Sequence, residues 1–180
     1  MVIYIITVFL AGNPDDSSMS AYFMDRLKNN FTITYLNNGL VRQIGKGPEI
    51  LLIEEEKIIS ENINNAVIVF KRDCTPLLSG KFLKENTVII SSYDKSNLKK
   101  ISGQNIETIT CGSSPKDTVT YSSSDDETIV VSLQREITSF TNKAVLPFEM
   151  PIKRLCDDDY NILAFFALSV KIGFTEKNSL

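Results

Sequence analysis

The sequence predicts an α/β domain in which a mostly parallel, helix-flanked sheet is followed by a small antiparallel layer near residues 118–148. Strand-like and helix-like segments alternate, and several strand-like segments are apolar on both faces, as expected when helices cover both sides of a sheet. After Gly112 the strand-like segments become short and are separated by polar turns, which is typical of antiparallel pairing. The length of 180 residues suits a single domain, residues 1–180.

The first predicted strand spans residues 2–10, a continuous apolar run rich in β-branched side chains. A loop over residues 11–18 leads into a helix that runs to about Lys28, because apolar side chains recur there at the 3–4 spacing of a half-buried helix. Residues 31–36 form the second strand, which the turn Asn37-Asn38-Gly39 closes.

The remaining strands are predicted where short runs of β-branched and other apolar residues lie between polar turns. In the parallel part they are residues 49–54, 66–70, 87–90 and 106–110. In the antiparallel layer they are residues 118–122, 128–134 and 144–148. A helix follows from about Asp159 to Lys171, and Gly173 is a typical helix stop.

The composition argues against several classes of function. The chain has no histidine, which removes the commonest general base and the commonest metal ligand. Its three cysteines, Cys74, Cys111 and Cys156, fit neither a disulfide framework nor a zinc pattern. Free thiols indicate a reducing compartment, so we expect a cytoplasmic protein.

The charge pattern gives no reason to expect a nucleic-acid or membrane partner. The net charge is −3, and basic residues never form a run longer than two, so there is no general attraction to polyanions. The apolar run at residues 2–10 has no basic residue before it, since the first is Arg26. It is also too short to span a bilayer, and a buried strand explains it better than a signal peptide.

The loop after the first strand has the layout of a phosphate-binding loop. A strand, a turn that begins with Gly12, and two hydroxyl residues, Ser17 and Ser18, at the start of a helix would place amides and hydroxyls around a phosphate and its magnesium ion. The turn carries Asp15 and Asp16 where such a loop needs a glycine and a lysine. An Asx-rich turn that caps a helix explains the same residues equally well.

Taken with the rest of the chain, this loop resembles that of the Mur ligases, which join amino acids to the muramyl precursor of peptidoglycan. Beside the family's Gly-Thr-Asn-Gly-Lys-Thr-Thr, the loop keeps the leading Gly12 and both hydroxyls. The strand that leads to Glu54 is similar to the family's strand ending in a magnesium-binding glutamate. Residues 89–94, which end in Asp94, look like the strand that ends in Asn-Ala-Asp-Asp.

The final helix carries the best match. Asp157-Asp158, Asn161 and Ala164 stand in the register of the family's His-Asn-x-x-Asn-x-x-Ala-Ala, and Gly173 follows at the expected distance. The resemblance covers nearly all of the chain but only the central, ATP-binding domain of the family, and it implies a P-loop-type topology. We therefore expect no N-terminal UDP-binding domain and no C-terminal ligase domain.

The departures from the family pattern predict that the chain is not an enzyme. The resemblance leaves a vestigial cofactor site, with residues Gly12, Asp16, Ser17, Ser18 and Glu54. Two unit charges 4 Å apart repel by about 4 kcal/mol at an effective dielectric near 20, so Asp16 facing a phosphate would weaken its binding on the order of a thousandfold. We expect no cofactor, no catalytic residue and no resident metal.

Two main hypotheses for the function remain, and an enzyme of unrelated chemistry ranks last. In the first, the chain is an inactive interaction or scaffold module in cell-wall-related assembly, which binds an unknown protein partner or itself. In the second, it binds a small molecule, an amine or a divalent cation in an acidic crevice at the carboxyl ends of the strands. The weak candidate ligands are Asp15, Asp16, Glu54 and Asp94. A simpler explanation is that Asp15 and Asp16 stabilise the N-terminus of their helix.

Overall fold

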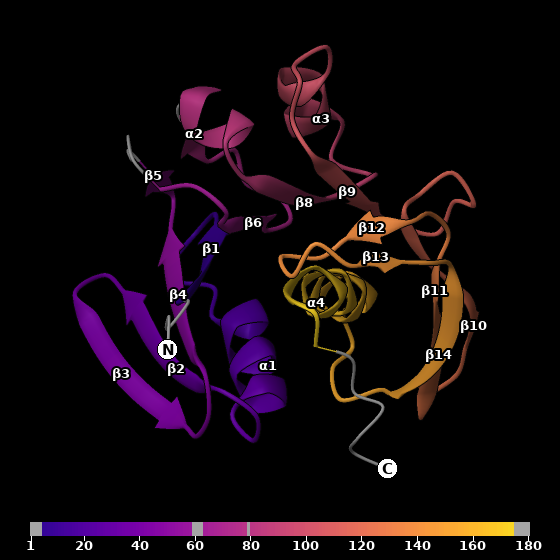
Figure 1. Cartoon of the computed structure of the whole chain (residues 1–180), viewed down its shortest axis with the longest axis horizontal. Coiled ribbons are helices and arrows are strands. Elements are labelled where there is room, and N and C mark those ends of the chain that lie inside the picture. Colours follow the sequence, from indigo (N-terminus) through magenta and orange to yellow (C-terminus); the bar gives the residue numbers. More distant parts are fainter. Residues whose placement is uncertain (1–4, 59–62, 79, 175–180) are drawn as a thin grey trace. The chain divides into compact units, whose positions relative to one another are not determined.

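A computed structural model of the chain describes residues 5–58, 63–78 and 80–174. Two compact units emerge: the first contains the chain up to Ile90 together with Asp94–Thr108, and the second contains Ser91–Tyr93 and the chain from Ile109 onward. Figure 1 labels their helices and strands. The prediction of a single domain stays a prediction.

The first unit is built on the predicted parallel sheet, with strand order β8-β6-β1-β4-β2-β3. The strands are β1 (Ile6–Ala11), β2 (Thr32–Asn37), β3 (Leu40–Gly45), β4 (Glu49–Glu55), β6 (Val67–Phe70) and β8 (Thr87–Ser91). All adjacent pairs are parallel except β2 and β3. The central strands are buried on both faces, as the apolar runs predicted. The part of the first predicted strand at residues 2–4 lies outside the described residues.

Helix α1 (Ser18–Leu27) matches the predicted helix, and it buries Tyr22, Phe23 and Leu27. The other face of the sheet belongs to a core cluster that includes Phe9, Ile68 and Val88. The short helices α2 (Gly80–Lys84) and α3 (Lys95–Ile101) also belong to this unit, as does a small parallel pair, β5 (Lys57–Ile58) and β7 (Leu77–Leu78). The carboxyl ends of β1, β4 and β6 therefore meet at one edge of the sheet.

The second unit has the strand order β9-β10-β11-β14. Strand β9 pairs parallel with β10, and β10, β11 and β14 form the predicted antiparallel layer. Its elements are β9 (Thr108–Cys111), β10 (Val119–Ser124), β11 (Thr128–Leu133), β12 (Ile137–Thr138), β13 (Ala144–Val145), β14 (Phe148–Lys153) and helix α4 (Asp159–Ile172). Helix α4 packs against β10 and β12, and the rings of Phe148 and Phe166 lie 5.5 Å apart. All its residues from Tyr160 to Ile172 are buried.

Helix α4 begins and ends as predicted. The Asp158 carboxylate accepts a hydrogen bond from the Tyr160 N–H at 2.9 Å, and Gly173 adopts the left-handed conformation that ends the helix. Lys171 is also buried. Its ammonium donates to the Thr138 carbonyl oxygen at 2.9 Å and lies 5.2 Å from the centre of the Phe140 ring.

Two strand predictions were wrong. Strand β3 is absent from the prediction, although Asn38 and Gly39, at φ 45° and 81°, form the tight turn of a β2–β3 hairpin. The single strand predicted at residues 144–148 is divided into β13 and the longer β14. Pro147 interrupts the run, and Pro151 is tolerated in β14 because that strand lies at the end of its sheet order.

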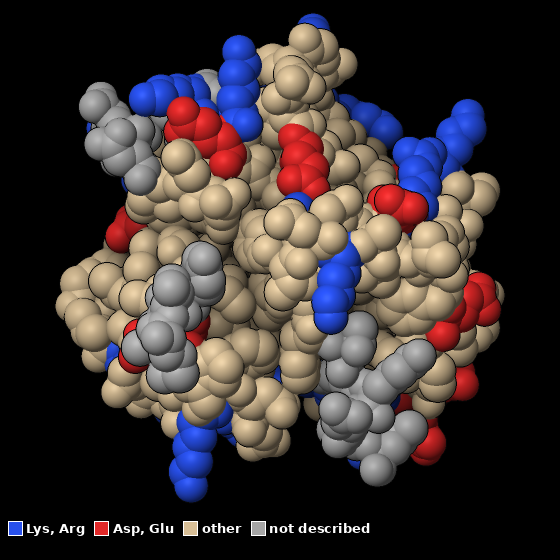
Figure 2. Space-filling model, in the orientation of Figure 1, with Lys and Arg blue, Asp and Glu red and all other residues tan. Residues whose placement is uncertain are grey.

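Among the helices of the described ranges, none is long and apolar enough to cross a membrane. On the face shown in Figure 2, basic and acidic side chains are scattered among the other residues, without a large area of one sign.

Candidate functional site

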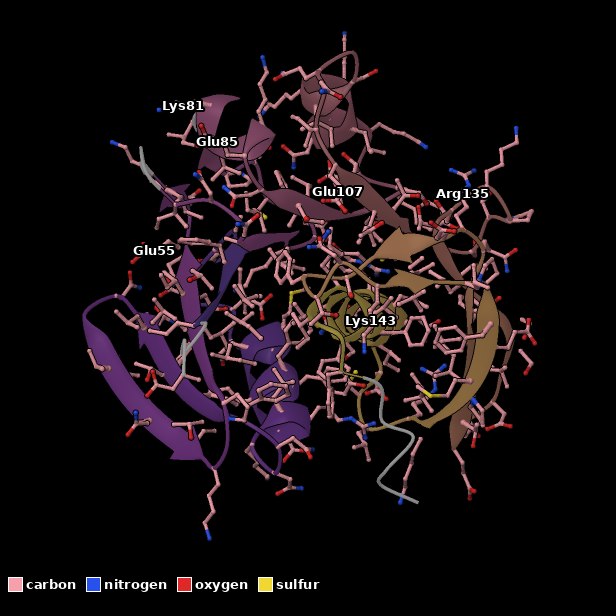
Figure 3. The ribbon with its side chains drawn as sticks, in the orientation of Figure 1. Glu55, Lys81, Glu85, Glu107, Arg135 and Lys143 are labelled. Atoms are coloured by element: carbon pink, nitrogen blue, oxygen red, sulfur yellow. The ribbon has the colours of Figure 1, made fainter. Side chains whose placement is uncertain are left out.

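The loop between β1 and α1 is held tightly by its first residue, Gly12. The Gly12 N–H donates to the carbonyl oxygen of Glu55 at 3.0 Å (Figure 3 labels Glu55). Gly12 has φ +155°, and a Cβ placed on it would lie 2.5 Å from the Cys74 Sγ and 2.8 Å from the Lys71 Cβ. Glycine is therefore required here because residues 71–74 fill the space beside the loop.

The side chains of Asn13 and Asp16 accept hydrogen bonds from the loop's own backbone. The Asp16 carboxylate accepts a hydrogen bond from the Ser18 N–H at 3.0 Å, and hydrogen bonds from Ser18 lower the pKa of Asp16. The Asp15 N–H donates to the Asn13 Oδ1 at 3.0 Å, and its carboxylate is exposed. The Asp16 carboxylate thus takes an amide at the start of α1 that an anion would otherwise bind, although the N-cap residue of α1 is Ser17.

Lys71, which sequence analysis missed, occupies the inside of the loop. It follows β6 directly, and its ammonium donates to the carbonyl oxygens of Asn13, at 2.6 Å, and of Asp16. The same ammonium forms an ion pair with Glu54, and the two side chains are 3% and 0% exposed. The loop therefore presents carbonyl oxygens to a cation, whereas a phosphate requires N–H donors.

Glu54, at the carboxyl end of β4, is the centre of a buried network. Its second oxygen accepts hydrogen bonds from the Ser20 hydroxyl at 3.0 Å, the Asn37 amide at 2.9 Å and the Tyr35 hydroxyl. Burial, followed by the hydrogen bond to Glu54, raises the pKa of Tyr35. The Asn37 amide also reaches the carbonyl oxygen of Pro14, at 2.8 Å. Glu54 thus fastens the loop to α1, β2 and β6.

The remaining candidate, Asp94, has a separate task at the start of α3. Its carboxylate accepts hydrogen bonds from the backbone N–H of Asn97 at 3.0 Å and from the Asn97 side chain at 2.6 Å. The Asn97 amide also donates to the Cys74 carbonyl oxygen at 2.8 Å. Within the described residues no group of three or more Cys, Asp or Glu side chains could hold a metal ion. The four weak candidates are therefore not assembled into one acidic crevice.

Ser17 and Ser18 are exposed, and a hydrogen bond from the Ser18 side chain helps to lower the pKa of Asp16. The Ser17 carbonyl oxygen accepts hydrogen bonds from the Ser20 hydroxyl at 3.1 Å and the Ala21 N–H at 2.9 Å. In the described structure, the loop thus has two internal substitutes for a ligand: the Asp16 carboxylate at the helix amide and the Lys71 ammonium beside Glu54.

Replacing Asp16 with alanine is expected to lower the free energy of unfolding by about 1 kcal/mol at pH 7, because the Ser18 N–H loses its acceptor. Asparagine keeps an acceptor and should cost less. The pKa of Asp16 is lowered in the folded chain, so its ionised carboxylate should stabilise the fold more than asparagine does. This extra stability is fully present above the ordinary Asp pKa of about 3.9 and is lost as the pH falls through the lowered pKa. Urea titrations at pH 7 and pH 3 measure this difference. An advantage of the same size at both values would contradict the assignment.

Comparisons with known proteins give a fold. No family model matches the sequence, and no curated protein matches it significantly. Among solved structures, a UDP-N-acetylmuramoyl-L-alanyl-D-glutamate–2,6-diaminopimelate ligase is similar over 97% of this chain and 44% of its own, with a TM-score of 0.54 and 9% identity. A UDP-N-acetylmuramate:L-alanyl-γ-D-glutamyl-meso-diaminopimelate ligase from Neisseria meningitides is similar over 94% of this chain and 62% of its own, with a TM-score of 0.52 and 12% identity.

The chain thus spans less than two thirds of either ligase. The chain has a Mur ligase-like fold.

Proposed function

We propose that this chain is a Mur ligase-like domain that neither binds ATP–magnesium nor carries out ligation, and that it acts as an interaction module. One observation carries the proposal: the Lys71 ammonium fills the loop where phosphates would bind, and it pairs with the glutamate that stands where the family binds magnesium. A lysine ammonium has three N–H donors and no acceptor. The contacts of the Lys71 ammonium with Asn13, Asp16 and Glu54 use all three of these donors.

Nucleotide binding would have to undo this arrangement. If the ammonium of Lys71 left the loop, Glu54 would remain as a buried and unpaired charge, and breaking such a pair typically costs about 3–5 kcal/mol. The loop carbonyls of Asn13 and Asp16 would then face the phosphate oxygens. Each 1.4 kcal/mol weakens binding tenfold, so the loss of the pair alone reduces affinity by about a hundredfold to several thousandfold.

An interaction role follows from what the chain keeps. The sheet, α1 and the loop are fixed by buried contacts that need no ligand, so the fold is available as a rigid surface. Binding to another protein or to a second copy would use this surface. The link to cell-wall assembly stays a prediction.

The direct test is isothermal titration calorimetry with ATP and magnesium, with an active Mur ligase as the positive control. We expect no heat of binding up to about 1 mM nucleotide, because the Lys71 ammonium occupies the loop and is already paired with Glu54. A dissociation constant in the low micromolar range would overturn the proposal.

Thermal-shift measurements with magnesium, calcium and spermidine test the alternative of cation or amine binding, and stabilisation by any of them would favour that alternative.

A further inference from the structure

Strand β3 is an open edge of the first unit. Within the described residues it pairs only with β2 and stands at the end of the strand order, as Figure 1 shows at the outer side of the β2–β3 hairpin. An unpaired edge presents a row of backbone N–H and C=O groups that another strand can join. Natural proteins usually protect such edges.

This edge has little of the usual protection. Strand β3 contains neither proline nor lysine, its one charged residue is Arg42, and Leu40 and Val41 are 57% and 66% exposed. By contrast, β14, at the end of the order in the second unit, carries Glu149, Pro151 and Lys153. Proline and charge are the devices that prevent strand addition, so the two strands differ in the property that decides whether an edge can be extended.

The edge is also rigid before any partner arrives. The Asn38–Gly39 turn holds one end of β3. The chain just after the other end is held by hydrogen bonds from the Lys46 N–H to the Lys28 carbonyl oxygen at 3.3 Å and from the Thr32 hydroxyl to the Gly47 carbonyl oxygen at 3.0 Å. A Cβ on Gly45 would lie 2.1 Å from the Phe31 carbonyl oxygen, because the chain returns closely over the α1–β2 connection. Strand addition therefore needs little further ordering of β3, which favours binding.

The register determines which backbone groups are free. The Thr32 N–H donates to the carbonyl oxygen of Pro48, just before β4, at 2.9 Å, so the backbone groups of Thr32 face β4. The backbone groups of every second residue from Ile33 onward therefore face β3. Their partners Leu40, Arg42 and Ile44 turn toward β2. The backbone groups of Val41, Gln43 and Gly45 consequently face outward.

We propose that β3 pairs with β3 of a second copy of this chain, antiparallel and centred on Gln43. In an antiparallel pair, the backbone groups of two opposite residues both face the partner strand or both face away from it. A twofold axis between two copies of β3 must therefore pass between a residue and the same residue of the second copy. An axis at Arg42 would place two arginines opposite each other, which is unfavourable. An axis at Ile44 would pair less of the strand. The Gln43 axis pairs residues 41–45, five of the six residues of β3, and sets Arg42 opposite Ile44 and Val41 opposite Gly45.

This proposal deepens the interaction role by naming its surface and its partner. At the twofold axis the exposed Gln43 side chain meets its own copy, so one substitution introduces two facing charges. Within its own chain Gln43 makes one long hydrogen bond, to Thr34 at 3.3 Å. Substitution at this position should therefore leave the fold of each copy nearly unchanged.

Sedimentation velocity of the full chain, across a range of concentrations, tests the proposal. We expect the unmodified chain to dimerise, and Gln43→Lys and Gln43→Glu each to raise the dimer dissociation constant about tenfold or more, through repulsion at the axis. An equimolar mixture of the two variants should dimerise again, because lysine then faces glutamate. Gln43→Thr serves as the matched control and should dimerise like the unmodified chain.

A chain that stays monomeric at about 100 μM, far above the micromolar range of weak specific dimers, would overturn the proposal. So would a dimer that neither charged variant weakens, or a mixture that fails to restore a dimer that both variants have lost. Thermal melts of all variants show whether each is folded. Calorimetry with ATP–magnesium on the same samples separates this result from the proposed function, because nucleotide binding would contradict that function without affecting the dimer.

Discussion

Replacing Lys71 with methionine is expected to lower the free energy of unfolding by about 3–5 kcal/mol, because Glu54 remains buried without its counter-charge. For a chain of this size the melting temperature should fall by about 10 °C. The two loop carbonyls of Asn13 and Asp16 also lose their donor, which adds to the loss. Urea unfolding and a thermal melt, both at pH 7, measure the change.

The double variant Lys71→Met/Glu54→Gln separates the ion pair from simple loss of packing. Glutamine carries no charge, so the double variant should recover part of the stability that Lys71→Met loses. Replacing the exposed Lys99 with methionine is the matched control and should change stability by less than about 0.5 kcal/mol. If Lys71→Met were as mild as Lys99→Met, the loop would not depend on an internal cation.

Replacing Gly12 with alanine is expected to cost about 3 kcal/mol, because the new Cβ would meet the Cys74 Sγ at 2.5 Å and the Lys71 Cβ at 2.8 Å. The substitution also forces a Cβ into the φ +155° conformation. Because the clash displaces Lys71, it also disturbs the ion pair with Glu54. Denaturant unfolding at pH 7 measures the loss.

Two controls separate the clash from the backbone strain. Gly103 also has a positive φ, of +76°, but a Cβ there would meet nothing within 4 Å, so Gly103→Ala reports strain without crowding. Adding Cys74→Ala to Gly12→Ala removes the nearest contact and should restore part of the stability. Equal losses in Gly12→Ala and Gly103→Ala would show that the space beside the loop is not filled as described.

The fold was largely predictable because its central strands are apolar on both faces. The runs at residues 49–54, 66–70 and 87–90 identified β4, β6 and β8, and the capping residues Asp158 and Gly173 identified α4. Strand β3 was missed because an edge strand has no buried face and so carries no alternating pattern. Strand β14 was misplaced because prolines usually argue against a strand.

The candidate site was predictable in part. The position of Asp16 before the predicted helix suggested that it stabilises the start of that helix, and its carboxylate accepts the Ser18 N–H there. The pairing of Lys71 with Glu54 did not, because it depends on the strand order β6-β1-β4, which brings two residues far apart in sequence to either side of one loop. A lysine directly after a fully apolar strand, at the sheet edge that also holds a glutamate, was the signal available in the sequence.

The complete burial of α4 has a consequence for how the chain folds during synthesis. Strands β10, β11 and β14 leave the ribosome before α4 does, and they cannot close their core until residues up to about Ile172 have emerged. In that interval the apolar side chains of Val119, Ile129 and Val131, which are buried in the finished protein, have no helix to cover them. Nascent chains with uncovered apolar strands associate readily. We therefore expect chaperones to engage the growing polypeptide at this stage, and products that stop before Asp159 to collect in inclusion bodies.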